Sequence, residues 1–237
     1  MIELKKPLSY SSLVRFIKEG WEGFINPTYK KSIAFEKGTI IDKLIFNEPF
    51  TEEIVDVKIP RPQIKTLIEE IINAKEEFTL EVITKYSELL DIKSKKFEKT
   101  FQEVFDNQDY INYFENNKNK FLKVNYDIAK SIADELRKDE DMMYYLSDGV
   151  AQFQHTFEYL GLPFLIKVDF LKVNDEDQEV IITDLKSSSF PPKFSDSIAR
   201  YFYHIQGKLY TLGIQDWLEK NNKSHYIIRP FTWVVTS

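Results

Sequence analysis

The chain has 237 residues, of which 43% are hydrophobic, and its formal net charge is −6. This length and apolar content suit one large domain, or one domain with an inserted subdomain. The sequence contains no cysteine, which excludes disulfides, zinc–thiolate sites and iron–sulfur clusters and fits a reducing cytoplasm. No segment resembles a signal peptide or a transmembrane helix. We therefore expect a cytoplasmic globular protein with no membrane partner, and the negative charge restricts any nucleic-acid surface to a local groove.

The first section of the chain predicts two helices. Leu13 and Ile17 follow the run Ser9–Ser12, a spacing typical of an amphipathic helix capped by a serine. A second helix is predicted from Phe35 to Phe46, and the segment Asn47–Pro49 ends it.

Residues 59–146 predict a helical insertion, because apolar residues recur there at helical spacing in a background of Lys, Glu and Asn. Its lysines could meet phosphate, but a mixed charge run is more often a solvated helix face. Those lysines include Lys93, Lys95, Lys96 and Lys99. The apolar stripes are Ile64, Leu67, Ile68, Ile71 and Ile72, then Phe97, Phe101, Val104 and Phe105, and finally Val124, Ile128, Ile132 and Leu136.

The last section predicts strands and one long helix. Residues 151–159, 164–173 and 179–185 form three strands of an antiparallel meander, separated by short turn-rich segments. A helix is expected from about Asp196 to Glu219, with its apolar residues facing inward. A final apolar strand, Tyr226 to Val235, ends the chain.

The third of these strands ends in an acid and a lysine, Asp184 and Lys186, which share a face because strand side chains alternate. A second acid, Asp169, closes the preceding strand. Two carboxylates at adjacent strand ends suit a hard cation such as Mg²⁺, which stabilises charge on phosphorus and lowers the pKa of a bound water. Lys186 would orient or help deprotonate that water, or hold a phosphate oxygen. Taken alone, however, Asp184 and Lys186 are more simply an exposed ion pair, worth under about 1 kcal/mol.

Four parts of the sequence carry a family resemblance. They are Leu8–Leu13 with Asn26–Pro27, Phe35–Asp42 with Asn47–Pro49, Lys167–Phe170 with Ile182–Ser188, and Tyr203–Tyr210. In these parts the chain resembles the PD-(D/E)XK nuclease superfamily and, within it, the RecE-type (exonuclease VIII-like) exonucleases of phages and prophages. The resemblance implies an α/β fold with a restriction-endonuclease-like core, a mixed central sheet flanked by helices. It also implies a single nuclease domain over residues 1–237, with residues 59–146 as the helical insertion.

The resemblance assigns catalytic roles to Asp169, Asp184 and Lys186 and implies Mg²⁺ as the cofactor, for which Mn²⁺ would substitute. The implied metal ligands are Asp42, Asp169, Asp184 and the backbone carbonyl of Leu185. Many relatives carry a histidine where this sequence has Asp42, although aspartate is itself a good ligand for a hard cation. Glu36, on a different face of the same helix, is the alternative ligand.

The segment Tyr203–Tyr210 resembles the Gln-x-x-x-Tyr helix of this family. Gln206 and Tyr210 lie four residues apart and share a helix face, so the resemblance implies that they position DNA. The structural alternative is that Tyr210 fills the core and Gln206 satisfies a buried backbone group. Ser187 and Ser188 are candidates for phosphate contacts, although such a run is more often only a loop.

The resemblance implies a Mg²⁺-dependent, ATP-independent exonuclease that degrades linear double-stranded DNA 5′ to 3′ for phage-type recombination. The implied partners are DNA ends, a single-strand annealing protein and further copies of the chain in a ring. Because relatives continue past the last predicted strand, the chain is also expected to be shortened at its C-terminus. Two alternatives stay open: another PD-(D/E)XK nuclease of restriction, repair or CRISPR-associated type, and an inactive DNA-binding module of the same fold. No Walker or Gly-x-Ser-x-Gly motif supports an ATPase or a serine hydrolase.

Overall fold

The computed structural model describes residues 6–27, 33–92, 97–116, 119–188 and 190–237, without the side chains of residues 33–35, 97 and 98. The chain forms two compact units. We call the first the sheet unit; it comprises Met1–Thr28, Ile41–Glu48 and Ser131–Ser237. The second, the helical unit, comprises Tyr29–Ile40 and Pro49–Lys130.

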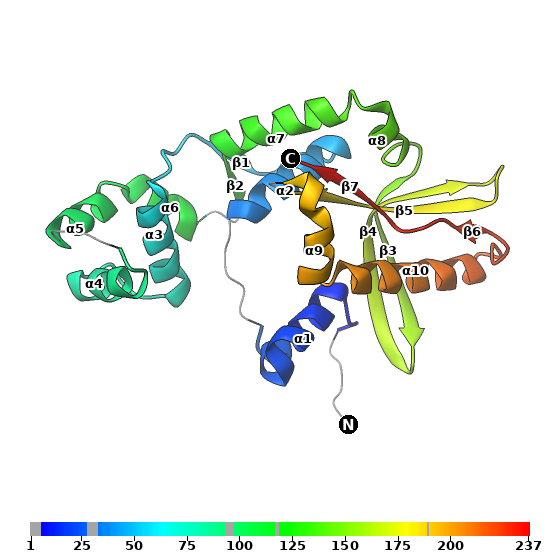
Figure 1. The fold of residues 1–237 in the computed structure, drawn as a ribbon, viewed down its shortest axis with the longest axis horizontal. Helices are drawn as coiled ribbons and strands as arrows, with labels where there is room; N and C mark the ends of the chain where they lie inside the picture. Colours follow the sequence, from blue (N-terminus) through cyan, green and yellow to red (C-terminus); the bar gives the residue numbers. More distant parts are fainter. Residues whose placement is uncertain (1–5, 28–32, 93–96, 117–118, 189) are drawn as a thin grey trace. The chain divides into compact units, whose positions relative to one another are not determined.

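The sheet unit is built on a mixed sheet of five strands (Figure 1). Strands β3 (Val150–Tyr159), β4 (Leu162–Asn174) and β5 (Glu179–Ser187) form an antiparallel meander, as the alternating pattern predicts. On its other side β5 pairs in parallel with β6 (Ile227–Ile228) and with β7 (Thr232–Thr236). β5 is therefore hydrogen-bonded on both sides, which explains why most of its residues are buried.

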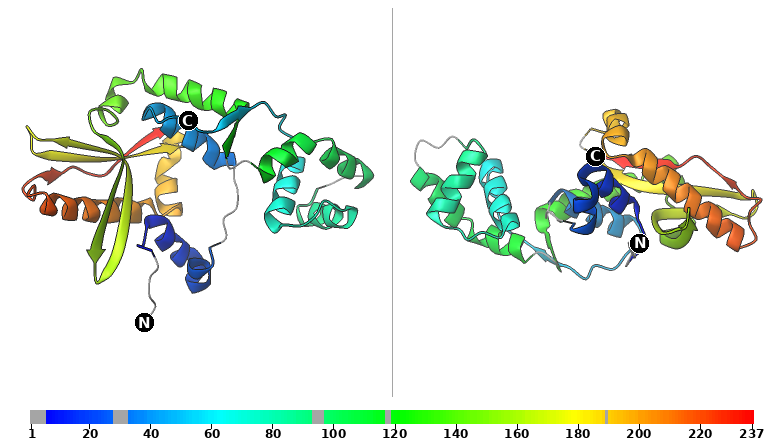
Figure 2. Two further views of the ribbon diagram at one scale, coloured as in Figure 1. Left: turned by 180° about the vertical axis from the view of Figure 1, so that it is seen from behind. Right: turned by 90° about the horizontal axis from the view of Figure 1, so that it is seen from below.

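Helix α10 (Tyr203–Lys220) packs against β3 and β4 in the sheet unit, as Figure 1 and Figure 2 both show. A core forms between them, in which Ile166 and Val168 of the sheet meet Leu209 and Ile214 of the helix. The approach is close at Gly213, where a Cβ atom would lie 2.6 Å from the side chain of Ile166. Glycine at this position thus lets the helix lie directly on the sheet.

Helix α1 (Tyr10–Ile25) begins where the serines predict it. The Ser9 side chain accepts a hydrogen bond from Ser12 N–H, and the Ser12 hydroxyl accepts one from Ser9 N–H at 2.7 Å. This capping box satisfies backbone donors that the first helical turn leaves without partners. Gly20, at φ 66°, interrupts the helical geometry inside α1.

The single helix predicted from Asp196 to Glu219 is wrong, because two helices occupy this range. The short η2 (Pro191–Lys193) leads into α9 (Phe194–Arg200), and α10 follows after a break. Phe202 lies at the break in the left-handed region, at φ 59°. A bulky residue rarely adopts this conformation, and no Gly or Pro in the sequence predicts the break.

The single strand predicted from Tyr226 to Val235 is also wrong, since the short strands β6 and β7 replace it. The segment between them contains Pro230, which has no N–H to donate to a sheet ladder. Both strands pair with β5, so the segment stays hydrogen-bonded to the sheet on either side of the interruption.

Two more helices contribute to the sheet unit through their C-terminal parts. The end of α2 (Ile33–Ile45) is held by stacking of Phe46 on Phe170 of β4, with ring centroids 5.7 Å apart. Arg137, just after α7 (Lys123–Leu136), donates a hydrogen bond to the carbonyl oxygen of Leu44. Helix α8 (Glu140–Tyr144) then leads into β3.

The helical unit has its own apolar core. Its helices are α3 (Pro62–Ala74), α4 (Leu80–Leu89), α5 (Phe97–Phe105) and α6 (Gln108–Glu115), with a parallel pair of short strands, β1 (Glu53–Val55) and β2 (Lys120–Leu122). Ile64, Leu67, Ile68 and Ile71 are fully buried in this core, as their stripe predicts.

One predicted stripe is wrong in part. Val124 and Ile128 of α7 are exposed, and Ala129 and Ala133 take the buried positions in their place. The prediction counted only large apolar residues, whereas small alanines allow close packing of a helix face.

The observed fold is a mixed α/β fold with a mixed, curled central sheet flanked by helices, as predicted. The division into one nuclease domain with an insertion at residues 59–146 stays a prediction. None of the helices in the described ranges combines the length and the apolar character needed to span a bilayer.

Candidate active site

Strands β4 and β5 bring the two predicted acids together. Their antiparallel ladder pairs Phe170 with Thr183, and one further residue in this register sets Asp169 opposite Asp184. Directly opposed residues of an antiparallel pair project from the same side of the sheet, with Cβ atoms about 5 Å apart. The sheet therefore places both carboxylates on one side and in one row.

The backbone hydrogen bonds between β4 and β5 end at this row. Beyond it, a side chain accepts the next hydrogen bond from β5. Oδ2 of Asp169 accepts a hydrogen bond from Leu185 N–H at 2.9 Å. β5 continues beyond it against β7, where Asp184 is paired with Trp233 and Lys186 with Val235. The carboxylate of Asp169 thus both faces the site and holds the strand that carries the other acid.

Asp184 is the most enclosed acid of the site, with 1% of its surface exposed. Its Oδ1 accepts a hydrogen bond of 2.6 Å from Nε2 of Gln206 on α10, and its Oδ2 forms an ion pair with Nζ of Lys186. Burial raises the pKa of Asp184, while Lys186 and Gln206 lower it. The predicted acid, lysine and glutamine are therefore in direct contact.

Asp42 joins this cluster from the end of α2. Burial raises the pKa of its carboxyl to about 7, Lys186 opposes that rise, and Asp184 adds to it. Burial likewise raises the pKa of Asp169 to about 8, with further contributions from the charges of Asp184 and Asp42. Three acids thus share one electrostatic environment, in which their negative charges are mutually unfavourable.

Lys186 is the cation of the cluster. Burial lowers its pKa, but the charges of Asp184 and Asp169 outweigh burial and leave the pKa raised. Its Nζ also lies 5.1 Å from the centroid of the Tyr203 ring, within the range of a cation–π contact. In this arrangement Lys186 stays protonated at neutral pH.

The donor set fits a hard divalent cation. Within the described residues, no group of three or more His, Cys, Asp or Glu side chains has the spacing to hold a metal ion as it stands. Asp184 nevertheless contacts Lys186, and the charges of Asp42 and Asp169 interact with both residues; carboxylate oxygen is the ligand that Mg²⁺ prefers. Burial raises the pKa values of Asp42 and Asp169, and the neighbouring acids raise them further; a bound divalent cation would favour the ionised carboxylates.

The two residues of the Gln-x-x-x-Tyr helix differ in their surroundings. Gln206 is 4% exposed, and its Oε1 is buried without a hydrogen-bond partner in the described part of the chain, so it can receive a donor from a bound water or ligand. Tyr210 is part of the core between α10 and the sheet, and burial raises its pKa to about 12. The DNA-positioning roles of both residues stay predictions, as does that of the Leu185 carbonyl.

The two serines after Lys186 lie where β5 ends. Ser187 is exposed and pairs with Thr236 of β7, whereas the Ser188 hydroxyl accepts a hydrogen bond from Phe190 N–H at 3.2 Å. Ser188 thus has a role in its own loop. Phosphate binding by either residue stays a prediction.

Glu36, the alternative metal ligand, is bound within the helical unit. One carboxylate oxygen accepts from Leu122 N–H at 2.6 Å and from Asn125 Nδ2 at 3.2 Å, and the other accepts from the Tyr113 hydroxyl. Both oxygens already have donors, which argues against Glu36 as the ligand and favours Asp42. Of the lysines considered for phosphate contact, Lys99 is exposed, and the other three lie outside the described residues.

Tyr203 borders the site beside Lys186, although the sequence pattern assigned it no role. Tyr203 begins α10 three residues before Gln206, so the helical spacing that joins Gln206 to Tyr210 also includes it. The ladder between β3 and β4 skips Gln152, which has a positive φ of 52° and falls opposite Asp169 only when the register of its neighbours is extended.

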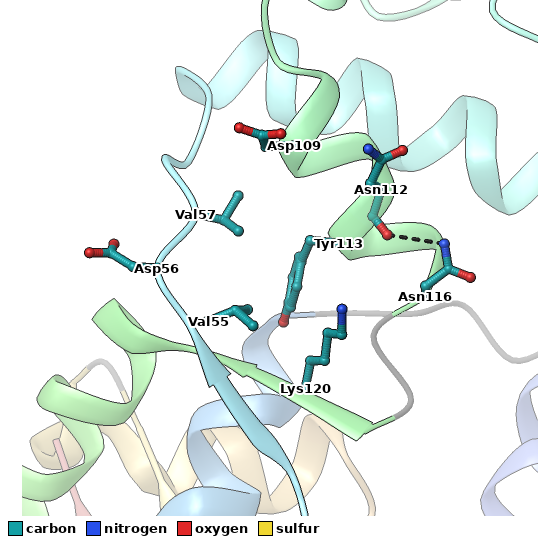
Figure 3. A pocket seen from close by; sticks show the side chains of 8 residues that line it. All are labelled: Val55, Asp56, Val57, Asp109, Asn112, Tyr113, Asn116 and Lys120. Atoms are coloured by element: carbon teal, nitrogen blue, oxygen red, sulfur yellow. Dashed lines mark hydrogen bonds between the residues drawn. The ribbon is translucent and has the colours of Figure 1, made fainter.

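A separate hollow of 430 Å³ lies within the helical unit (Figure 3). Its polar groups mostly serve the local structure: Nδ2 of Asn116 donates to the carbonyl oxygen of Asn112 at 3.2 Å, and the Tyr113 hydroxyl is bound to Glu36. The lining residues are Val55, Asp56, Val57, Asp109, Asn112, Tyr113, Asn116 and Lys120. We assign no chemistry to this hollow.

A family model matches most of the chain, whereas the likeness to a solved structure is weak. Among solved structures, the chain is similar to a crystal structure from Eubacterium rectale described as a "putative exonuclease", with 14% identity and a TM-score of 0.49 over 98% of this chain and 67% of that one. At this identity and score the likeness carries no argument. No curated protein matches the sequence. The model of a family described as "PDDEXK-like domain of unknown function (DUF3799)" matches residues 30–229, a range that includes all three acids and Lys186. The chain therefore belongs to this PDDEXK-like family of the PD-(D/E)XK nuclease superfamily.

Proposed function

We propose that the protein is a metal-dependent nuclease that hydrolyses phosphodiester bonds of DNA. One observation carries the proposal: Asp169 and Asp184 face each other across two strands, and Asp184 contacts both Lys186 and Gln206. A surface ion pair would not need this burial or a second acid in the same row. The family membership supports the same chemistry.

Each residue of the site would have a different role in hydrolysis. A divalent cation bound by Asp42, Asp169 and Asp184 would supply Lewis acidity toward the phosphate and toward the attacking water. Lys186, held as a cation by Asp184, orients a phosphate oxygen or the water that attacks phosphorus. Gln206 fixes the rotamer of Asp184 through its hydrogen bond and leaves Oε1 to accept one from the water or the nucleotide.

The finer assignment is a Mg²⁺-dependent exonuclease of the RecE type that acts on the ends of linear double-stranded DNA, with Mn²⁺ as a substitute for Mg²⁺. It rests on the resemblance of segments 35–42, 182–188 and 203–210 to that family. A 5′ to 3′ polarity, a role in phage-type recombination, a ring of several copies and an annealing partner belong to the same proposal.

The test is digestion of a linear duplex and of a closed circular plasmid in Mg²⁺. We expect nucleotides to be released from the linear DNA alone and Lys186→Ala to abolish most of the activity, since a positioned proton-transfer or charge-stabilising group contributes about 10²- to 10⁴-fold. Lys208→Ala, which removes an exposed lysine of α10, should leave the rate unchanged. Cutting of the circle would indicate an endonuclease instead.

Lack of cleavage by the wild-type protein on both substrates, together with no binding of Mn²⁺, would contradict the proposal. That outcome would favour the inactive DNA-binding module. Asp184→Asn is the matched variant for the metal titration, because it keeps the shape of the buried side chain and removes its charge.

A further inference from the structure

Tyr201, at the break between α9 and α10, presents an exposed aromatic ring. It follows the last residue of α9, and 43% of its surface is exposed. Its backbone is fixed, because the Tyr10 hydroxyl of α1 donates a hydrogen bond to the Tyr201 carbonyl oxygen. The neighbouring Phe202 has a left-handed backbone, a strain that folded proteins retain mainly where function requires it.

Two exposed cations flank the Tyr201 ring. Nζ of Lys18 lies 5.6 Å from the ring centroid, and the guanidinium carbon of Arg200 lies 6.0 Å from it. Neither cation forms an ion pair with an acidic side chain in the described part of the chain. An exposed aromatic ring with nearby cations that have no acidic partners is the combination that binds single-stranded nucleic acid, in which the ring stacks a base and the cations meet the phosphates.

This ring is connected to the catalytic lysine through one intervening side chain. The Tyr201 and Tyr203 ring centroids lie 5.6 Å apart, and the Tyr203 centroid lies 5.1 Å from Nζ of Lys186. At a rise of about 3.4 Å per stacked nucleotide, these two steps span at most about three nucleotides. The Tyr201 ring is therefore within reach of a strand whose scissile phosphate lies at the acids.

We propose that Tyr201, Lys18 and Arg200 form a subsite that stacks an unpaired nucleobase of the substrate strand and binds its phosphate. The inference rests on the proposed function, because it names the form in which that site receives DNA, a strand already separated from its complement. A duplex end would have to fray before its strand reached the acids. Unstacking a base costs free energy. Stacking of that base on the Tyr201 ring would offset part of this cost.

The test is binding of a fluorescent single-stranded oligonucleotide in EDTA, followed by anisotropy. Tyr201→Ala should weaken binding about tenfold, since stacking on one aromatic side chain has a contribution of this order. Tyr201→Phe should keep an affinity close to that of the wild type, because the ring remains. Tyr144→Ala is the matched control: Tyr144 is 53% exposed and has Lys172 Nζ 4.2 Å from its ring centroid, but it belongs to α8.

The salt dependence separates the ring from the cations. Lys18→Gln and Arg200→Gln should each reduce the slope of log affinity against log salt concentration by about 0.7, because each removes one phosphate contact with a single strand. Tyr201→Ala should lower the affinity and leave the slope unchanged.

Wild-type affinity in Tyr201→Ala, or an equal loss in Tyr144→Ala, would overturn the subsite. These measurements contain no metal, so they fail independently of the proposed function. Lys186-dependent cleavage combined with no effect of Tyr201→Ala on binding would reject the subsite alone. Tyr201-dependent binding without any cleavage in Mg²⁺ would reject the nuclease and keep the subsite.

Discussion

Gln206 Nε2 donates a hydrogen bond of 2.6 Å to Oδ1 of Asp184, and this bond joins α10 to the central strand β5. Both side chains are almost completely buried. A hydrogen bond to a charged acceptor contributes more to stability than one between neutral groups, and its loss leaves the acceptor unsatisfied. The bond therefore matters to the fold as well as to the site.

We predict that Gln206→Ala lowers the free energy of unfolding by about 2 kcal/mol at pH 8, because Oδ1 of Asp184 loses its donor in a buried position. Denaturant unfolding followed by circular dichroism measures this change. Gln215→Ala on the same helix is the control, since Gln215 is exposed and bonded only to Glu219 at 3.4 Å. Equal effects of the two substitutions would contradict the prediction.

The metal-free protein should become less stable as the pH rises from about 4 to about 8. The pKa of Asp42 is raised to about 7 and that of Asp169 to about 8, from 3.8 for an ordinary Asp. In this window the unfolded chain has lost protons that the folded chain still holds, so unfolding becomes easier as the pH rises. Each pH unit between the folded and unfolded pKa of a carboxyl is worth about 1.4 kcal/mol.

Thermal unfolding in EDTA across this pH range tests the slope. Asp169→Asn should flatten it and stabilise the metal-free protein at pH 8, whereas Asp148→Asn, at a highly exposed position, should not. Added Mg²⁺ or Mn²⁺ should raise the melting temperature more at pH 8 than at pH 5, because the cation binds the ionised acids. A stability that rises steadily from pH 4 to pH 8 in EDTA would contradict the assignment.

Lys186→Met should destabilise the protein at pH 8 by about 3 kcal/mol, because Asp184 would remain buried without its cation. At pH 5 the loss should be smaller, since Asp184 can then take up a proton. A double-mutant cycle with Asp184→Asn measures the pair directly, and we expect a coupling energy above about 1 kcal/mol. Simple additivity of the two substitutions would show that the ion pair contributes little.

Glu36→Ala should separate the fold from the metal site. It removes the acceptor of three donors in the helical unit, among them Leu122 N–H, and should cost about 3 kcal/mol. The folded variant should bind Mn²⁺ as tightly as the wild type, whereas Asp42→Asn should bind it more weakly. Isothermal titration at 10 °C keeps the weaker variant folded, and a loss of affinity in Glu36→Ala would restore Glu36 as a ligand.

The strands of the meander could be predicted because their signals are local. The prediction that Asp169 closes its strand is wrong, since β4 continues to Asn174. Alternating apolar residues and the turn at Leu160–Gly161 predict β3 and β4, and the spacing of Asp184 and Lys186 within β5 fixes their common face. The position of Asp169 opposite Asp184 then follows from the register of a two-strand hairpin.

The remaining features depend on partners far along the chain. The break at Phe202 has no Gly or Pro to signal it, and the apolar periodicity of residues 196–219 continues across it. Glu36 and Asp42 could not be separated by sequence, because the donors that bind Glu36 lie 77 to 89 residues away. Pro230 does indicate an interruption of the last strand, because proline cannot donate to a sheet ladder. The apolar run around it nevertheless led to the prediction of one continuous strand.

The bond from Leu185 N–H to Asp169 makes one backbone amide a reporter of the whole site. This amide donates its hydrogen bond to a carboxylate instead of a carbonyl oxygen. Any ligand that displaces the carboxylate therefore also breaks the hydrogen bond of the amide. A cation that takes Oδ2 as a ligand competes for the same lone pairs. Its arrival would be recorded as faster deuterium uptake at a single position near the C-terminal end of β5, a strand that is hydrogen-bonded on both sides.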